Sequence, residues 1–248
     1  MHEHEMYDEM VIYIEACESG SMFENLLPED INIYATTAAN AIESSWGYYC
    51  YPDDVVNGVH IGSCLGDLYS IIWMENSDES QVCTETISEQ FDVVKTKTTK
   101  SHVMEYGDKS IKSEVVGNFE GSCDAPSIQN KFLNYLSKTV TSIKDQFERE
   151  YTAWDSRDVK LHYLYNRYIE TKDPIDALEL QDEIQHRQLI DYKFERISKS
   201  VNLTLKQGLK NHDCYKTLVN LYIDVCGYDE YSLKHFNVLA ELCNTNTD

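Results

Sequence analysis

Cys17 is the residue of this sequence best suited to covalent chemistry. It lies in MVIYIEACESGSMF, residues 10 to 23, where an apolar run ends in a turn rich in Ser and Gly. A thiolate attacks carbonyl carbons well, provided that a base or cation lies nearby and that backbone N–H groups hold the oxyanion. A cysteine at a strand end, followed by a flexible turn, has the exposure and the donors for this reaction.

The same pattern also fits a structural thiol. Glu15 and Glu18 flank Cys17, and their negative charge disfavours a thiolate unless one of them points into a substrate pocket. From these residues alone, Cys17 is either a nucleophile held at a strand end or a half-buried thiol where the chain turns.

The elements that would position Cys17 form a mixed α/β region over residues 10–125. The apolar, β-branched runs at 10–16 and 31–38 predict two buried strands of the parallel type. The stretch SHVMEYGD, residues 101–108, predicts a further strand that ends in a turn. We therefore expect a mainly parallel sheet with flanking helices.

Two of those helices are visible in the pattern. Leu68, Ile71 and Ile72 have helical spacing, which predicts a helix over 66–75, and a second helix is predicted over 84–98. Asp67 would lie near the start of the first helix, where an acidic residue suits the helix dipole. Helix capping is thus one explanation of Asp67 that involves no chemistry.

From about residue 130 the pattern becomes entirely helical. Apolar residues recur at the spacing of an amphipathic helix: Phe132, Leu136, Val140, Ile143, Phe147 and Tyr151. Asp173 and Pro174 predict the capped start of another helix. Further helices are predicted over about 174–207, which Gly208 ends, over 214–226, which Gly227 ends, and over 231–243. The expected organisation is an α/β domain at 1–125, a helical linker at 126–172 and an all-α domain at 173–248.

The composition excludes some classes of protein. No apolar run approaches the roughly 20 residues that span a bilayer. Residues 1–9 are acidic, whereas a secretory signal begins with basic residues and continues with an apolar stretch. We therefore expect no membrane association, and either a protein that is not secreted or a natural N-terminus that precedes residue 1.

Charge is divided unevenly along the chain. The net charge is −22, and residues 1–94 contain 19 Asp and Glu but neither Lys nor Arg, the first of which is Lys95. Such an acidic part repels the phosphates of nucleic acid. It attracts something basic, such as the Lys- and Arg-bearing remainder of the same chain, although a solvated acidic surface explains the charge equally simply.

The eight cysteines contain no C-x-x-C pair, which argues against a zinc site, and we expect no metal or cofactor. Asn202 begins the glycosylation sequon Asn-Leu-Thr, which fits a protein of the secretory route.

Several long segments are recognisable together. They read VIYIEACESGSMF from residue 11, LLPEDINIYATTAAN from 26, ESSWGYYC from 43 and CLGDLYSIIWMENSD from 64. With SHVMEYGD, they closely resemble the legumain family, the asparaginyl endopeptidases or vacuolar processing enzymes of the caspase-like clan of cysteine peptidases. The resemblance is dense over 10–108, weakens over 109–165 and returns at DEIQHRQLID, residues 182–191. It implies a caspase-like α/β peptidase domain followed by a death-domain-like helical prodomain.

The resemblance makes Cys17 the nucleophile. It would attack the carbonyl after an Asn, less readily an Asp, and form a thioester. Water would resolve the thioester to hydrolysis, and an incoming amine would resolve it to a new peptide bond.

The resemblance also assigns Glu15, Ser45 and Asp67 to the pocket for the Asn side chain, with Ser44 lining the same site. Carboxylates suit the NH2 group of a primary amide, because that group donates hydrogen bonds. The family binds the amide C=O with a basic residue from a segment upstream of Met1.

One departure from the family concerns the base. The family's catalytic His lies upstream of the cysteine in a Gly-rich turn, and no such motif occurs here. His2 and His4 lie in an acidic leader without glycines. We therefore expect the chain alone to be inactive, and we interpret it as lacking roughly the first half of the peptidase domain.

The C-terminal part resembles the prodomain that covers the family's active site and is removed at acidic pH by cleavage after an Asn. Asn166 is the best candidate for that cleavage and Asn130 the alternative. The resemblance implies two disulfides, Cys50–Cys64 and Cys214–Cys243, and a partner for Cys226 beyond residue 248. It assigns no role to Cys83 or Cys123, for which free structural thiols are the default.

The implied partners are protein substrates with Asn at the cleavage site and the chain's own prodomain, and the implied location is the vacuole or lysosome. As a hypothesis, the acidic peptidase part pairs with the basic residues of the prodomain at neutral pH, and carboxylate protonation near pH 4 to 5 weakens that pairing. Two alternatives stay open: a non-catalytic homologue that acts as a binding or inhibitory module, and a fragment that does not fold because a sheet edge is exposed.

Overall fold

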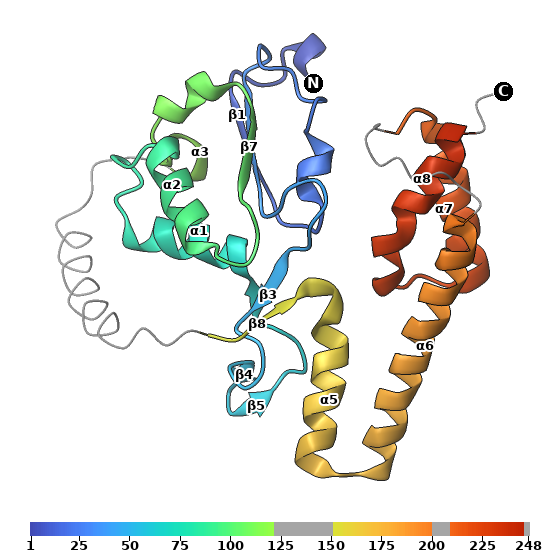
Figure 1. Cartoon of the computed structure of the whole chain (residues 1–248). Helices are drawn as coiled ribbons and strands as arrows, with labels where there is room; N and C mark the ends of the chain where they lie inside the picture. Colours follow the sequence, from blue (N-terminus) through green and yellow to red (C-terminus); the bar gives the residue numbers. More distant parts are fainter. Residues whose placement is uncertain (122–150, 200–208, 246–248) are drawn as a thin grey trace. The chain divides into compact units, whose positions relative to one another are not determined.

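The computed structural model describes residues 1–121, 151–199 and 209–245 (Figure 1). The chain divides into two compact units, Met1–Val159 and Lys160–Asp248, called unit 1 and unit 2 below. Unit 1 combines strands and helices, whereas the described part of unit 2 is helical. An α/β region followed by a helical region is what the sequence patterns predict, and this prediction is confirmed.

The main sheet of unit 1 contains β1 (Met10–Ile14), β2 (Ile33–Thr37) and β7 (Met104–Gly107). β1 and β2 are parallel, as predicted, but β7 runs antiparallel to β2, so the expectation of a mainly parallel sheet is wrong for the described strands. The central strand β2 is almost wholly buried, whereas every residue of β1 is only half-buried, since β1 lies at an edge of the sheet in the described part of the chain.

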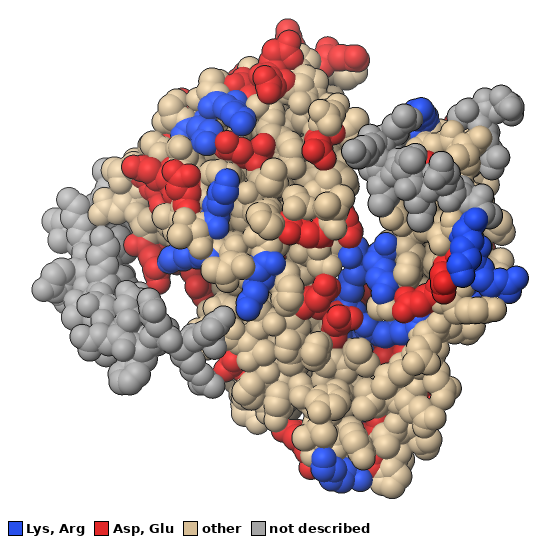
Figure 2. Space-filling view, viewed as in Figure 1, with Lys and Arg blue, Asp and Glu red and all other residues tan. Residues whose placement is uncertain are grey.

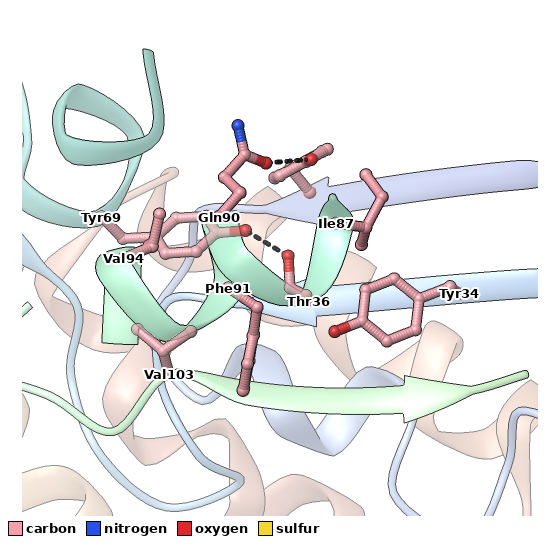
Figure 3. Close-up of a pocket in the computed structure, with 9 residues that line it drawn as sticks. Tyr34, Thr36, Tyr69, Ile87, Gln90, Phe91, Val94 and Val103 are labelled. Atoms are coloured by element: carbon pink, nitrogen blue, oxygen red, sulfur yellow. Dashed lines mark hydrogen bonds between the residues drawn. The ribbon is translucent and has the colours of Figure 1, made fainter. Parts of the chain in front are cut away.

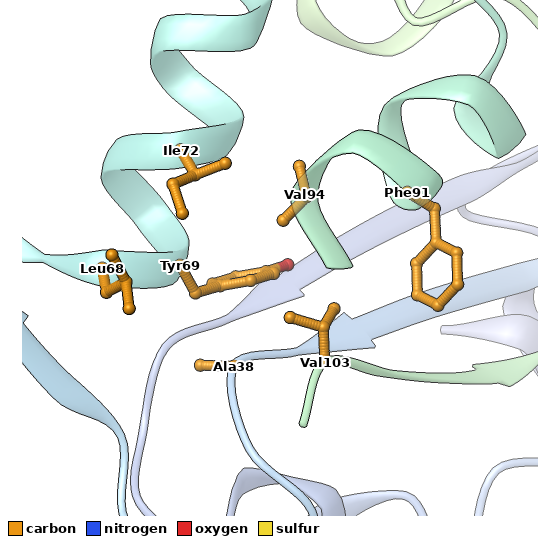
Figure 4. Close-up of a cluster of buried hydrophobic side chains, with 7 residues drawn as sticks. All are labelled: Ala38, Leu68, Tyr69, Ile72, Phe91, Val94 and Val103. Atoms are coloured by element: carbon orange, nitrogen blue, oxygen red, sulfur yellow. The ribbon is translucent and has the colours of Figure 1, made fainter. Parts of the chain in front are cut away.

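Two helices pack with the sheet, α1 (Leu68–Glu79) and α2 (Ile87–Lys97). Thr86 and Glu89 form a capping box at the start of α2, which satisfies two backbone donors of its first turn. The apolar faces of both helices meet the ends of β2 and β7 in one buried cluster (Figure 4): Ala38, Leu68, Tyr69, Ile72, Phe91, Val94 and Val103. This cluster fixes α1, and therefore the residues at its N-terminus, relative to the sheet.

Beside this cluster, hydroxyl groups line a small cavity between sheet and helices (Figure 3). Thr36 and Tyr69 are hydrogen-bonded through their hydroxyls at 2.6 Å, and Tyr13 donates to Gln90 at 2.5 Å. The cavity measures about 10 Å³ and has room for about one water molecule. It is therefore too small to be a substrate site.

A second, smaller sheet contains β6 (Gly66–Asp67), β3 (Trp46–Tyr48) and β8 (Ala153–Asp155), with β3 antiparallel to both neighbours. Because Gly66 and Asp67 pair with β3, α1 begins at Leu68 rather than at 66 as predicted. The hairpin β4 (Val55–Val56) and β5 (Val59–His60) lies in the loop closed by the Cys50–Cys64 disulfide.

Short helical segments complete the described part of unit 1: η1 (His2–His4), η2 (Ser19–Met22), η3 (Lys109–Ser113), α3 (Gly117–Glu120) and η4 (Ser156–Asp158). Acidic side chains gather in patches on the visible face of unit 1, with Lys and Arg among them (Figure 2). Glu105, for example, is paired within unit 1 with Lys112 at 2.6 Å and with Lys109 at 3.4 Å. Part of the acidic charge is thus neutralised locally.

Unit 2 contains most of α5 (Val159–Thr171), followed by α6 (Pro174–Ser198), α7 (His212–Cys226), η5 (Tyr231–His235) and α8 (Phe236–Thr245). Asp173 caps α6 and Gly227 follows α7, both as predicted. The helix predicted over 231–243 begins instead with the 3-10 segment η5. The helix predicted from Phe132 to Tyr151 and the end predicted near Gln207 lie outside the described residues.

The core of unit 2 forms where α6 meets α7 and α8, around Ile190, Phe194, Phe236, Val238 and Leu239. The Cys214–Cys243 disulfide joins α7 to α8. Cys83 is disulfide-bonded, so the default expectation of a free thiol is wrong there, whereas Cys17 and Cys226 are free. No helix in the described ranges is long and apolar enough to cross a membrane.

Candidate active site

Cys17 follows β1 and precedes η2, at the carboxyl end of the parallel pair β1–β2. The loop that follows β2 reaches the same edge of the sheet, because adjacent parallel strands end side by side. Ser19 and Ala39 join the two connections, since the Ser19 hydroxyl accepts from the Ala39 N–H at 3.1 Å and lies 3.2 Å from the Ala39 carbonyl. Residues 17–20 and 38–45 therefore form one surface around the thiol.

Ser45 makes the hydrogen-bond contacts of the Cys17 thiol. Its backbone N–H donates to Cys17 Sγ at 3.3 Å, and its hydroxyl lies 3.5 Å from the same sulfur. Ser45 is itself 3% exposed. These contacts fix the position of the sulfur beside the loop that follows β2.

Glu15 lies two residues before the thiol and is largely withdrawn from water. One carboxylate oxygen accepts from the Ser70 N–H in the first turn of α1 at 2.8 Å, whereas Oε1 is buried without a hydrogen-bond partner. Burial raises the pKa of Glu15 to about 7, the charge of Asp67 adds to this rise, and the bond from Ser70 opposes it. Near neutral pH the pocket can thus offer both a proton donor and an acceptor.

Asp67 occupies the N-cap position of α1 but makes no capping hydrogen bond through its side chain. Its carboxylate accepts instead from the Ser156 hydroxyl at 3.3 Å. Burial raises the pKa of Asp67, although the bond from Ser156 opposes this. The capping explanation of Asp67 therefore does not describe its side chain, which is directed into the site.

Two residues that sequence reasoning missed complete the cluster. The Ser156 hydroxyl lies 3.1 Å from that of Ser45, which connects Cys17 through Ser45 and Ser156 to Asp67. The guanidinium of Arg157 forms a two-pronged ion pair with Glu18, in which Nη1 lies 2.9 Å from Oε1.

Arg157 also places a cation beside the thiol. It donates to the Ser44 hydroxyl at 3.3 Å. Although burial opposes ionisation, its bond to Glu18 and the nearby Cys17 sulfur raise its pKa. The run YTAWD, residues 151–155, contains two aromatic residues and one β-branched residue. It is the sequence signal that could have revealed β8, the strand that ends directly before Ser156 and Arg157.

The remaining predicted sites lie elsewhere. Asn166, the predicted processing residue, is half-buried within α5, so cleavage there requires local opening of the helix. Asn202 and Asn130 lie outside the described residues. Within the described ranges, no group of three or more His, Cys, Asp or Glu is placed to hold a metal ion.

Comparison with known sequences finds two families that match different parts of the chain. Residues 1–122 match the Peptidase C13 family, and residues 178–248 match the legumain prodomain. Residues 151–157, which bring Ser156 and Arg157 to Cys17, lie between the two matched regions.

Curated relatives resemble nearly the whole chain. It is 36% identical over 270 residues to vacuolar-processing enzyme beta-isozyme 1 of Oryza sativa subsp. japonica, covering 98% of this chain and 52% of that protein. It is 38% identical over 263 residues to the beta-isozyme of Arabidopsis thaliana, covering 96% and 52%. It is 34% identical over 277 residues to the delta-isozyme of Arabidopsis thaliana, covering 100% and 56%.

The chain therefore spans about half the length of these relatives. The two matched regions, in the order peptidase and prodomain, together with a cysteine-centred site in the first of them, lead to one conclusion: the chain belongs to the legumain family of C13 cysteine peptidases, as a homologue of the vacuolar-processing enzymes.

Proposed function

We propose that Cys17 is the nucleophile of an endopeptidase that cleaves after Asn, and less readily after Asp, through a thioester. The observation that carries this proposal is the connected set of Cys17, Ser45, Ser156 and Asp67. It joins a free thiol to a half-buried carboxylate through two hydroxyl groups. Thiolate attack on the carbonyl carbon expels the amine half of the substrate, and water or another amine then releases the acyl group.

The pocket chemistry suits a primary amide. An Asn side chain presents two N–H donors and one C=O acceptor. Asp67 and the unpartnered Oε1 of Glu15 can accept from the NH2 group. The hydroxyls of Ser45 and Ser156 can either accept from the NH2 group or donate to the C=O group. An Asp side chain matches this set only when it is protonated, which explains a weaker reaction with Asp.

The chain also fills its own site. β8 pairs with β3, and the next two residues, Ser156 and Arg157, contact Asp67, Ser45, Glu18 and Ser44. A substrate side chain directed at Asp67 would have to displace Ser156. The described form is therefore a blocked, zymogen-like state, and β8 lies where an extended peptide would add to the edge of β3. The names of the relatives favour processing in a vacuole.

We test this function with a peptide-Asn epoxide probe and its Ala counterpart, reading modification of Cys17 by peptide mass spectrometry. The second free thiol is removed in a Cys226→Ser background. We expect faster labelling by the Asn probe, and a further rise in Arg157→Ala, which opens the site. Equal labelling by the Asn and Ala probes would contradict the proposed specificity.

Hydrolysis is measured in parallel with a fluorogenic peptide ending in Asn at about pH 5, with Cys17→Ala as control. No described histidine hydrogen-bonds to Cys17, so we propose that this chain alone does not turn over. Turnover that depends on Cys17 would show that another group supplies the base.

A second candidate function is a non-catalytic module that binds or inhibits intact relatives. The observation that favours it is the same self-occupied site. Adding the chain to a vacuolar-processing enzyme would lower that enzyme's activity if this function holds, and no change would exclude it.

A further inference from the structure

Glu43 lies in the loop that carries Ser44 and Ser45 but contacts neither the thiol nor the pocket carboxylates directly. Its backbone carbonyl accepts from the Glu18 N–H at 2.7 Å, the residue that immediately follows the thiol. The next two residues along the loop, Ser44 and Ser45, contact Arg157 and Cys17 respectively. The position of Glu43 therefore influences both the residue after the thiol, Glu18, and the two serines that contact Arg157 and Cys17.

The side chain of Glu43 is held from three directions. Its Oε1 accepts from the N–H of Asn40 at 2.9 Å and from the N–H of His102 at 2.8 Å, and its Oε2 lies 2.8 Å from Nδ1 of His102. Ser101, next to His102, donates to the Ala38 carbonyl at 2.6 Å. The segment before β7 is thus bonded to both ends of the turn that follows β2.

The turn that follows β2 packs closely against Gly20, so neither segment can move independently of the other. A Cβ at Gly20 would lie 2.8 Å from the carbonyl carbon of Asn40 and 2.9 Å from the nitrogen of Ala41. The turn and the residues after Cys17 therefore pack backbone against backbone, and a small displacement of one displaces the other.

We propose that Glu43, together with His102, is a positioning residue that holds the Ser45 N–H against the Cys17 sulfur. The inference rests on the proposed role of Cys17 as nucleophile. Glu43 acts through Ser45 and Glu18 and touches no reacting atom. Although partial burial opposes ionisation, the hydrogen bonds from Asn40 and His102 hold the pKa of Glu43 below its usual range, so the carboxylate stays charged at neutral pH.

The test reads the two backbone bonds directly. In Glu43→Ala we expect amide hydrogen exchange at Glu18 and Ser45 to accelerate at least tenfold, with exchange in α1 and α2 unchanged. Glu43→Gln keeps an oxygen that can accept from Asn40 and His102, so it should restore most of the protection. Glu29→Ala, at an exposed glutamate, is the matched control.

His102→Ala guards against a Glu43→Ala variant that fails to fold, because the His102 side chain is 76% exposed and its loss should be tolerated. We expect intermediate acceleration at the same two amides. Wild-type exchange at Glu18 and Ser45 in both Glu43→Ala and His102→Ala would overturn the proposal. Acceleration spread evenly over unit 1 in His102→Ala would also overturn it, because His102 would then stabilise the whole unit and not the two backbone bonds at the site.

Labelling of Cys17 by the Asn probe supplies the functional readout. We expect it to fall about tenfold in Glu43→Ala and to recover in Glu43→Gln. If no probe labels the wild-type protein selectively, the proposed function fails, whereas the exchange measurements still decide the role of Glu43.

Discussion

Buried carboxylates in unit 1 and unit 2 have opposite surroundings. In unit 1, Glu15 lies near Asp67, has a buried oxygen without a partner, and has a raised pKa. In unit 2, Glu183 lies between two cations, 2.6 Å from Lys160 and 2.8 Å from Arg187. Burial alone would raise the pKa of Glu183, but these two partners lower it.

The difference separates a structural ion network from a site arranged for a ligand. Glu183 and Arg187 are both 6% exposed and form a charged hydrogen bond with each other, so the negative charge of Glu183 is compensated within the fold. The charged form of Glu15, in contrast, destabilises the folded protein. Carboxylates whose pKa is strongly perturbed by burial are found most often at functional sites. The comparison predicts that removing the two carboxylates changes stability in opposite directions.

The largest effect is expected from Glu183→Ala. It removes the buried carboxylate that pairs with Arg187 and with Lys160, which should destabilise unit 2 by about 3 kcal/mol. Peptide-resolved hydrogen exchange of α6 and α8 in the whole chain measures this change. Glu195→Ala, at an exposed glutamate of the same helix, is the control, and a similarly small effect of both variants would break the comparison.

Glu15→Gln should instead stabilise unit 1 by about 2 kcal/mol at pH 8. The pKa of Glu15 is raised to about 7, so between about 4.5 and 7 the folded state holds a proton that the unfolded state has lost. Its contribution to stability therefore falls as pH rises through this window, and Gln has no charge to bury. The gain should disappear at about pH 4.

Denaturation followed by tryptophan fluorescence measures this, because Trp46, Trp73 and Trp154 all belong to unit 1. If the variant is instead less stable than the wild type at pH 8, the charged carboxylate of Glu15 is stabilised by an interaction other than the contacts described above. The same variant should label more slowly with the Asn probe. A gain in stability together with a loss of labelling would show that Glu15 serves substrate binding and not stability.

Asp191→Asn should have the smallest effect, about 0.5 kcal/mol, because the Asp191 side chain is 48% exposed and solvent screens its charge. Burial opposes ionisation, but His235, Tyr231 and Lys234 lower the pKa of Asp191. The stabilisation is thus present above the unfolded pKa, near 4, and is lost as pH falls through the lower folded value. Exchange of α8 should differ between variant and wild type at pH 7, and the difference should shrink as the pH falls below about 4.

The hypothesis of charge pairing between the acidic and basic parts of the chain stays a prediction. Two of the described ion pairs lie within one unit: Glu18 pairs with Arg157 in unit 1, and Glu183 pairs with Lys160 in unit 2. The domain boundaries at 125 and 172 likewise stay predictions, although Arg157, from the predicted linker, contributes to the site of unit 1.

The sequence alone determined much of this protein, because its signals are local. Apolar, β-branched runs specified β1 and β2, Asp173 and Gly227 marked helix ends, and the motif around Cys17 indicated the family. Motif resemblance also selected Glu15, Ser45 and Asp67, which the structure brings to one place.

Only the tertiary structure decided what these residues contact. Asp67 has the sequence position of a helix cap, yet its carboxylate accepts from Ser156, 89 residues away. The pairing of β8 with β3, which brings Ser156 and Arg157 to the thiol, depends on backbone hydrogen bonds between distant segments. No local pattern encodes such a pairing, because its stability comes from the partner strand and not from the sequence of either strand alone.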